Sequence, residues 1–82
     1  MKRAEAKKII KDEGLVSHHL FEKREDASDE MVIRKEAGKW VVYATNERAA
    51  RITEGEAVYE TEEEALDHFI RRLRALNRVR NL

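Results

Sequence analysis

The fold is decided by residues 31–45, MVIRKEAGKWVVYAT. Two runs rich in β-branched and aromatic residues, 31–35 and 39–45, are separated by a short connection that ends in Gly38. Such a pattern is typical of a β-hairpin, because glycine adopts the left-handed backbone conformation that a tight turn requires. The stretch therefore predicts two antiparallel strands at the centre of the fold.

The register of this hairpin depends on its turn. A two-residue turn pairs Ile33 with Val42, whereas a turn with a glycine bulge pairs Ile33 with Val41, and the sequence leaves both open. We expect Trp40 and Val42 to lie on the buried face of the sheet, because burial of the indole ring gains most.

Outward from the hairpin, the N-terminal segment predicts a helix over residues 3–13. Ala6, Ile9 and Ile10 fall on one helical face, and Gly14 follows where a helix end favours glycine.

The C-terminal segment predicts a second helix that begins after Thr61. Glu64 lies three residues beyond this threonine, which is the spacing of a capping box. An apolar stripe follows at helical spacing, and it should supply much of the core: Leu66, Phe69, Ile70, Leu73 and Leu76.

Two weaker strands complete the expected sheet, a short edge strand within residues 15–25 and a last strand at 57–60. Residues 46–55 form either a long connection or an irregular hairpin that continues the sheet, with Ile52 as the only large apolar residue. We therefore predict one α+β domain over residues 1–82. It has an antiparallel three- to four-stranded sheet with the N- and C-terminal helices packed on one face. The predicted core consists of Trp40, Val42, Leu66, Phe69, Ile70 and Leu73.

Composition restricts the classes of function. The chain of 82 residues has no cysteine, which excludes disulfides and thiolate metal sites and fits a reducing compartment. No apolar stretch is long enough to span a membrane, and the basic N-terminus lacks the apolar core of a secretory signal. We expect a cytoplasmic protein without a membrane partner.

No catalytic, cofactor or metal motif is recognisable. His18 and His19 point to opposite sides if their segment is a strand, and His68 is expected at the surface of the last helix. The spacing of these histidines matches no metal-binding motif, and the three glycines make no phosphate-binding loop. We therefore expect no enzyme, no cofactor and no specific metal.

Charge is balanced overall, with 17 bases and 17 acids, but it is unevenly distributed. Residues 54–67 contain seven acids and no base, and we call this stretch the acidic run. Residues 71–80 contain five arginines. Two interpretations are open: the helix dipole favours basic residues in a last turn, or the arginines form a stripe that binds phosphate. The alternative is therefore a nucleic-acid-binding domain of double-stranded-RNA-binding-like topology. Its chemistry is opposed by the acidic turn that starts the last helix, so nucleic acid is not the expected partner.

Three stretches, GKWVVYATNER (38–48), YETEEEAL (59–66) and FIRRL (69–73), carry a family resemblance, and EAKKII (5–10) is compatible with it. The sequence is similar to the Immunity protein 59 family of bacterial polymorphic toxin systems. That resemblance implies a small α+β protein that binds and neutralises a toxin, and it names no toxin.

We therefore expect a basic protein partner, for example a toxin domain, that binds at the acidic run. Tyr43 and Tyr59 are the candidate anchors if they are exposed, and Glu47 and Arg48 are expected to add contacts from the same end of the sheet. The oligomeric state is left open. The predicted partner-binding residues are Tyr43, Glu47, Arg48, Glu54, Glu56, Tyr59, Glu60 and Glu63.

Overall fold

The predicted hairpin forms the centre of the sheet in the computed structural model, which describes residues 1–80 of the expected domain. Strand β2 (Met31–Glu36) pairs antiparallel with strand β3 (Lys39–Thr45). Ile33 lies opposite Val42, which is the register of a two-residue turn. The hairpin therefore has the first of the two registers that its sequence allows.

The turn itself consists of Ala37 and Gly38, and both have positive φ angles of 50° and 79°. Positive φ at both central residues defines the type I′ turn, whose twist matches that of the flanking strands. The register places Val42 in the core and Trp40, which is half-buried, against it. The prediction for this face of the sheet is confirmed.

Two further strands extend the sheet to the order β1-β2-β3-β4. Strand β4 (Arg51–Tyr59) is antiparallel to β3, but strand β1 (His18–Leu20) runs parallel to β2. The antiparallel prediction is thus confirmed for three strands and wrong for β1. Alternation along three residues locates a strand, but it carries no information about the direction of its neighbour.

Strand β4 begins within residues 46–55, so the irregular hairpin, one of the two alternatives that the sequence left open for this stretch, is the one present. The pairing with β3 jumps from Val42–Ala57 to Ala44–Ile52. Gly55, which has a φ of 81°, lies within the extra residues. An irregular strand of this kind lacks the strict alternation by which strands are recognised.

Helix α1 (Arg3–Glu13) and helix α2 (Glu62–Arg80) have the expected ends. Gly14 adopts a left-handed conformation with a φ of 63°, and its amide donates to carbonyl groups of the last turn of α1. At the start of α2, the Glu64 amide donates to Thr61 Oγ1 at 3.3 Å, and the Thr61 hydroxyl donates to Glu64 Oε1 at 2.8 Å. The predicted capping pair is therefore present.

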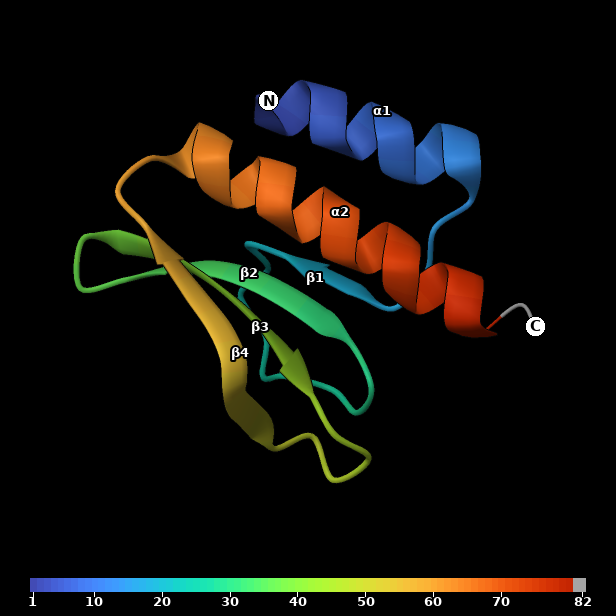
Figure 1. The fold of residues 1–82 in the computed structure, drawn as a ribbon, viewed down its shortest axis with the longest axis vertical. Coiled ribbons are helices and arrows are strands. Elements are labelled where there is room, and N and C mark those ends of the chain that lie inside the picture. The colour runs from blue at the N-terminus through green and yellow to red at the C-terminus, as the bar shows by residue number, and fades with distance from the viewer. Residues whose placement is uncertain (81–82) are drawn as a thin grey trace.

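Helix α2 packs on one face of the sheet, and α1 lies alongside α2 (Figure 1). Two ion pairs join the helices, between Arg3 and Glu62 at 2.8 Å and between Arg74 and Glu13 at 2.6 Å. Ala6 and Ile10 of α1 enter the main core. The six residues predicted for this core lie together: Val42, Leu66, Phe69, Ile70 and Leu73 are buried, and Trp40 packs against them.

The other face of the sheet carries a second buried cluster that the sequence did not reveal. It consists of Val32, Val41 and Tyr43, whose exposed fractions are 0%, 4% and 1%. The connection between β1 and β2, residues 21–30, lies against this face, since Asp26 bonds the Tyr43 hydroxyl and the Ala27 carbonyl accepts from Thr45. The central strands β2 and β3 are therefore covered on both faces. Within the described part of the chain, no helix combines the length and the apolar character needed to cross a bilayer.

Candidate functional site: a buried polar network

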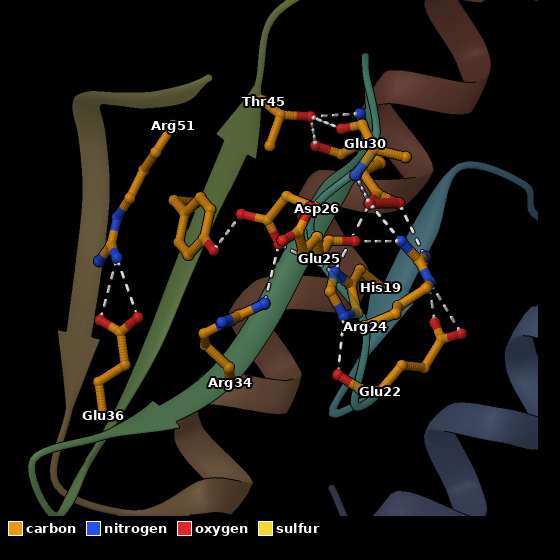
Figure 2. A network of polar contacts seen from close by, with 12 residues as sticks. His19, Glu22, Arg24, Glu25, Asp26, Glu30, Arg34, Glu36, Thr45 and Arg51 are labelled. Carbon is orange, nitrogen blue, oxygen red and sulfur yellow. Dashed lines mark hydrogen bonds and ion pairs between the residues drawn. The ribbon is translucent and has the colours of Figure 1, made fainter. Parts of the chain in front are cut away.

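Ionisable side chains meet where the connection 21–30 crosses the sheet (Figure 2). They come from β1, from the connection, from β2 and from β3. We call this set the polar network, and it consists of His19, Arg24, Asp26, Glu30, Arg34 and Tyr43. Buried charges are costly unless they are paired. A cluster of six ionisable side chains is therefore unusual in a domain of this size.

His19 is the centre of the polar network and is only 1% exposed. Its Nε2 atom lies 2.9 Å from the backbone carbonyl oxygen of Glu22. Its Nδ1 atom lies 3.0 Å from Asp26 Oδ1 and 3.5 Å from Glu30 Oε1. Neither oxygen lies in the direction that a hydrogen bond to Nδ1 requires, so this nitrogen has no hydrogen-bond partner among the described residues.

The two carboxylates are held by other donors. Asp26 accepts from the Tyr43 hydroxyl at 2.6 Å and from Arg34 Nη2 at 2.9 Å. Glu30, which is 4% exposed, accepts from Arg24 at both oxygens, each at 3.0 Å. Burial alone would raise the pKa of Glu30. The hydrogen bonds from Arg24 and from the Ala27 amide outweigh that effect and hold this pKa below its usual range.

Tyr43 closes the polar network from the side of the sheet. Burial, and then its hydrogen bond to Asp26, raise the pKa of this phenol to about 12. The guanidinium carbon of Arg51 lies 4.1 Å from the centre of the ring, and Arg51 is itself bound to Glu36 through two contacts of 3.0 Å. The phenol is therefore neutral and firmly placed at physiological pH.

The backbone at both ends of the connection is unusual. Phe21 and Asp29 have positive φ angles of 55° and 53°, a conformation that costs about 1–3 kcal/mol for residues other than glycine. Asp29 donates its amide to the Asn46 carbonyl, and Glu30 donates its amide to Thr45 Oγ1 at 3.0 Å. These contacts offset the strain and fix Asp26 and Glu30 beside His19.

The structure separates the residues that the sequence predicted as a partner-binding surface. Tyr43 is 1% exposed, so the condition for its use as an anchor is not met. Tyr59 is half-buried, and its hydroxyl is hydrogen-bonded to His68 Nδ1 at 2.7 Å. Glu47 and Arg48 lie in the turn before β4, whereas Tyr59 ends that strand, so the expectation that they share one end of the sheet is wrong.

Most of the acidic run is neutralised by basic groups close to it. Ion pairs join Glu56 to Arg51, Glu60 to Lys39 and Asp67 to the amino group of Met1, in addition to the pair between Glu62 and Arg3. Glu54, Glu63 and Glu64 are exposed and have no cationic partner within residues 1–80. The free negative charge of the surface is therefore smaller than the sequence indicates.

The polar network could not be predicted from the sequence, because its members are far apart in the chain and follow no known motif. His18 and His19 do point to opposite sides, as expected of a strand, and His19 is the buried one. Its partners at positions 26 and 30 lie in a polar stretch that is typical of a loop. No spacing rule joins a strand histidine to loop carboxylates that the fold alone brings together.

No family model, no curated protein and no solved structure matches the chain significantly. The similarity to the Immunity protein 59 family therefore stays a prediction.

Proposed function

We propose that the chain is a non-catalytic protein-binding module that captures a basic partner at the outer edge of β4 and the adjoining start of α2. The observation that carries this proposal is the exposure of β4, which ends the sheet and whose first five residues, 51–55, are all exposed. An edge strand offers unpaired backbone donors and acceptors to a strand from another protein.

Side chains at this edge favour a protein ligand. Ile52 and Val58 are 38% and 56% exposed. Ile52 pairs with Ala44 and Val58 with Val41, so these two apolar side chains lie on opposite faces of β4. A strand added at the edge would meet an apolar side chain on each face, and such contacts supply affinity that surface charges do not.

The charge near this edge favours a basic ligand. Glu54 on β4 and Glu63 and Glu64 on the first turn of α2 are the acids of the run that lack a cationic partner within the described chain. Unpaired surface charges mainly increase the rate of association with a partner of opposite charge. A toxin domain that holds nucleic acid in a basic cleft is such a partner, and the resemblance to an immunity protein family supports this choice.

The experiment is co-expression with the product of the adjacent gene, followed by pull-down and by measurement of association and dissociation rates. Glu54→Lys with Glu63→Lys should slow association, most strongly at low salt. Val58→Asp should instead accelerate dissociation. Asp12→Lys with Glu25→Lys is the matched control, because it makes the same change in charge at exposed acids away from both β4 and the start of α2.

Two outcomes would contradict the proposal. If charge reversal at Glu54 and Glu63 leaves the association rate unchanged, these acids do not contribute to recognition of the partner. A complex unaffected by Val58→Asp would place the interface elsewhere. If no neighbouring product binds, the toxin-neutralising role loses its support and only a fold-level analogy is left.

A further inference from the structure

We propose that His19, Asp26 and Glu30 form a binding site for a first-row divalent cation of the Zn²⁺ type, and that Arg24 competes with the cation for Glu30. One potential ligand atom from each of these residues lies within 4.8 Å of the other two. From the contacts of His19, the ligand atoms would be His19 Nδ1, Asp26 Oδ1 and Glu30 Oε1. This inference goes beyond the proposed binding function, does not depend on it, and runs against the sequence-based expectation of no metal.

The hydrogen bond made by Nε2 leaves Nδ1 of His19 available as a metal ligand. Because a carbonyl oxygen can only accept, the hydrogen between His19 Nε2 and the Glu22 carbonyl, which are 2.9 Å apart, belongs to Nε2. In neutral imidazole, Nδ1 then carries the lone pair. A backbone carbonyl that fixes one ring nitrogen while the other faces a cation is a common arrangement at metal-ligating histidines.

That lone pair points into a space bordered by carboxylate oxygens. His19 is 1% exposed and its Nδ1 atom lacks a hydrogen-bond partner among the described residues, although Asp26 Oδ1 is 3.0 Å and Glu30 Oε1 3.5 Å away. Three electron-rich atoms at such distances repel one another unless a positive group lies between them. The arrangement therefore favours a cation.

The distances fit the vertices of a coordination shell. Ligand atoms about 2.0–2.1 Å from a tetrahedral zinc ion are separated from each other by about 3.3 Å. The separations of 3.0 and 3.5 Å from Nδ1 lie on either side of that value. Both oxygens also lie off the hydrogen-bonding direction of Nδ1, as neighbouring ligands of one ion do. One nitrogen and two oxygens are a donor set that suits Zn²⁺.

Arg24 occupies the place of the cation at Glu30. Its guanidinium group binds both Glu30 oxygens at 3.0 Å, and it also contacts Glu22. The Arg24 side chain is 39% exposed, so it can turn into solvent when a cation takes over Glu30. Arg34, which binds Asp26 at 2.9 Å, limits the site in the same way at the second carboxylate.

The rival occupant is a proton. If Nδ1 is protonated, His19 is an imidazolium that faces two carboxylates, and the polar network is purely structural. The two alternatives can be distinguished by measurement. If a proton occupies the site, the chain binds no stoichiometric metal ion, and removal of Arg24 does not tighten metal binding.

The test is calorimetric titration of the chelator-dialysed full chain with Zn²⁺. We expect one ion per chain. His19→Gln should weaken binding by more than about 100-fold, because a ligand is worth at least as much as its supporting residues. His18→Gln is the matched control, since His18 is the neighbouring residue on the opposite side of β1, and it should leave the affinity unchanged. Asp26→Asn provides a second loss variant, in which an oxygen acceptor for Tyr43 and Arg34 is kept.

The decisive variant is Arg24→Gln, which removes the competitor and should tighten Zn²⁺ binding by about tenfold. Nitrogen NMR of the His19 ring gives an independent readout, because Zn²⁺ should shift Nδ1 while Nε2 keeps its hydrogen. The proposal is overturned if Zn²⁺ does not bind, if binding depends on His18 instead of His19, if Arg24→Gln weakens it, or if the ring carries hydrogen on both nitrogens with Zn²⁺ present.

Discussion

Replacement of Tyr43 by phenylalanine tests the polar network without a change of shape. Tyr43 is 1% exposed, and its hydroxyl donates to Asp26 Oδ2 at 2.6 Å. The substitution leaves the ring in the second cluster and takes one donor from a partly buried carboxylate. Loss of a hydrogen bond to a charged group costs about 1.5–3 kcal/mol, so Tyr43→Phe should lower the free energy of unfolding by that amount at neutral pH.

The dependence of stability on alkaline pH gives a second estimate of the contribution of Tyr43 to the free energy of unfolding. Burial, followed by the hydrogen bond to Asp26, raises the pKa of Tyr43 from 10.0 to about 12. Since the unfolded chain releases this proton first, the contribution of Tyr43 is fully present below pH 10 and is lost as the pH rises toward 12. Two pH units correspond to roughly 3 kcal/mol. Phenylalanine cannot ionise, so the stability advantage of the parent protein should fall by that amount across this interval.

The assay is denaturant unfolding followed by Trp40 fluorescence at a series of pH values, together with an ultraviolet titration of the phenols. Tyr59→Phe is the matched control, because the Tyr59 hydroxyl is hydrogen-bonded to His68 and takes no part in the polar network. The reasoning is refuted if Tyr43→Phe and the parent protein lose stability in parallel between pH 10 and pH 12, or if the variant still shows a phenol that titrates near pH 12.

Three further predictions concern the core, the turn and nucleic acid. Leu73→Asp should unfold the domain, because an unpaired buried charge costs several kcal/mol against a total stability of roughly 4–12 kcal/mol; a circular dichroism melt like that of the parent would contradict the core described here. Ala37→Asn should raise the free energy of unfolding by about 0.5–1 kcal/mol, measured as a higher urea midpoint, because Ala37 has a φ of 50° and asparagine tolerates that conformation better; an unchanged midpoint would argue against turn strain. RNA and DNA should bind only weakly at physiological salt, since Arg74 is paired with Glu13 and Arg72 with the Gly55 carbonyl; sub-micromolar binding that is lost without these two arginines would favour the nucleic-acid alternative.

Much of the fold was predictable because its signals are local. The β2–β3 hairpin follows from a glycine turn between two apolar runs, and the ends of the helices follow from Gly14 and Thr61. The main core then follows from periodicity, since the stripe along α2 has to face the buried side of the hairpin.

What could not be predicted depends on contacts between distant segments. The parallel direction of β1 arises because the connection 21–30 returns across the far face of the sheet before β2 begins. That same crossing buries Tyr43 and assembles the carboxylates around His19. Neutralisation of the acidic run also depends on distant bases, for example Arg3 against Glu62. Composition and spacing contain none of these pairings.

The place of α1 beside α2 has a consequence for how the chain folds as it is made. Synthesis on the ribosome proceeds from the N-terminus, so α1 emerges early, yet Glu13 and its partner Arg74 are separated by 61 residues. Until α2 has emerged, the apolar face of α1 around Ala6 and Ile10 has no helix to cover it. An isolated helix of 11 residues is marginal in water. The nascent chain should therefore hold α1 as a fluctuating segment until α2 has been made, and docking of the two helices should follow the synthesis of α2.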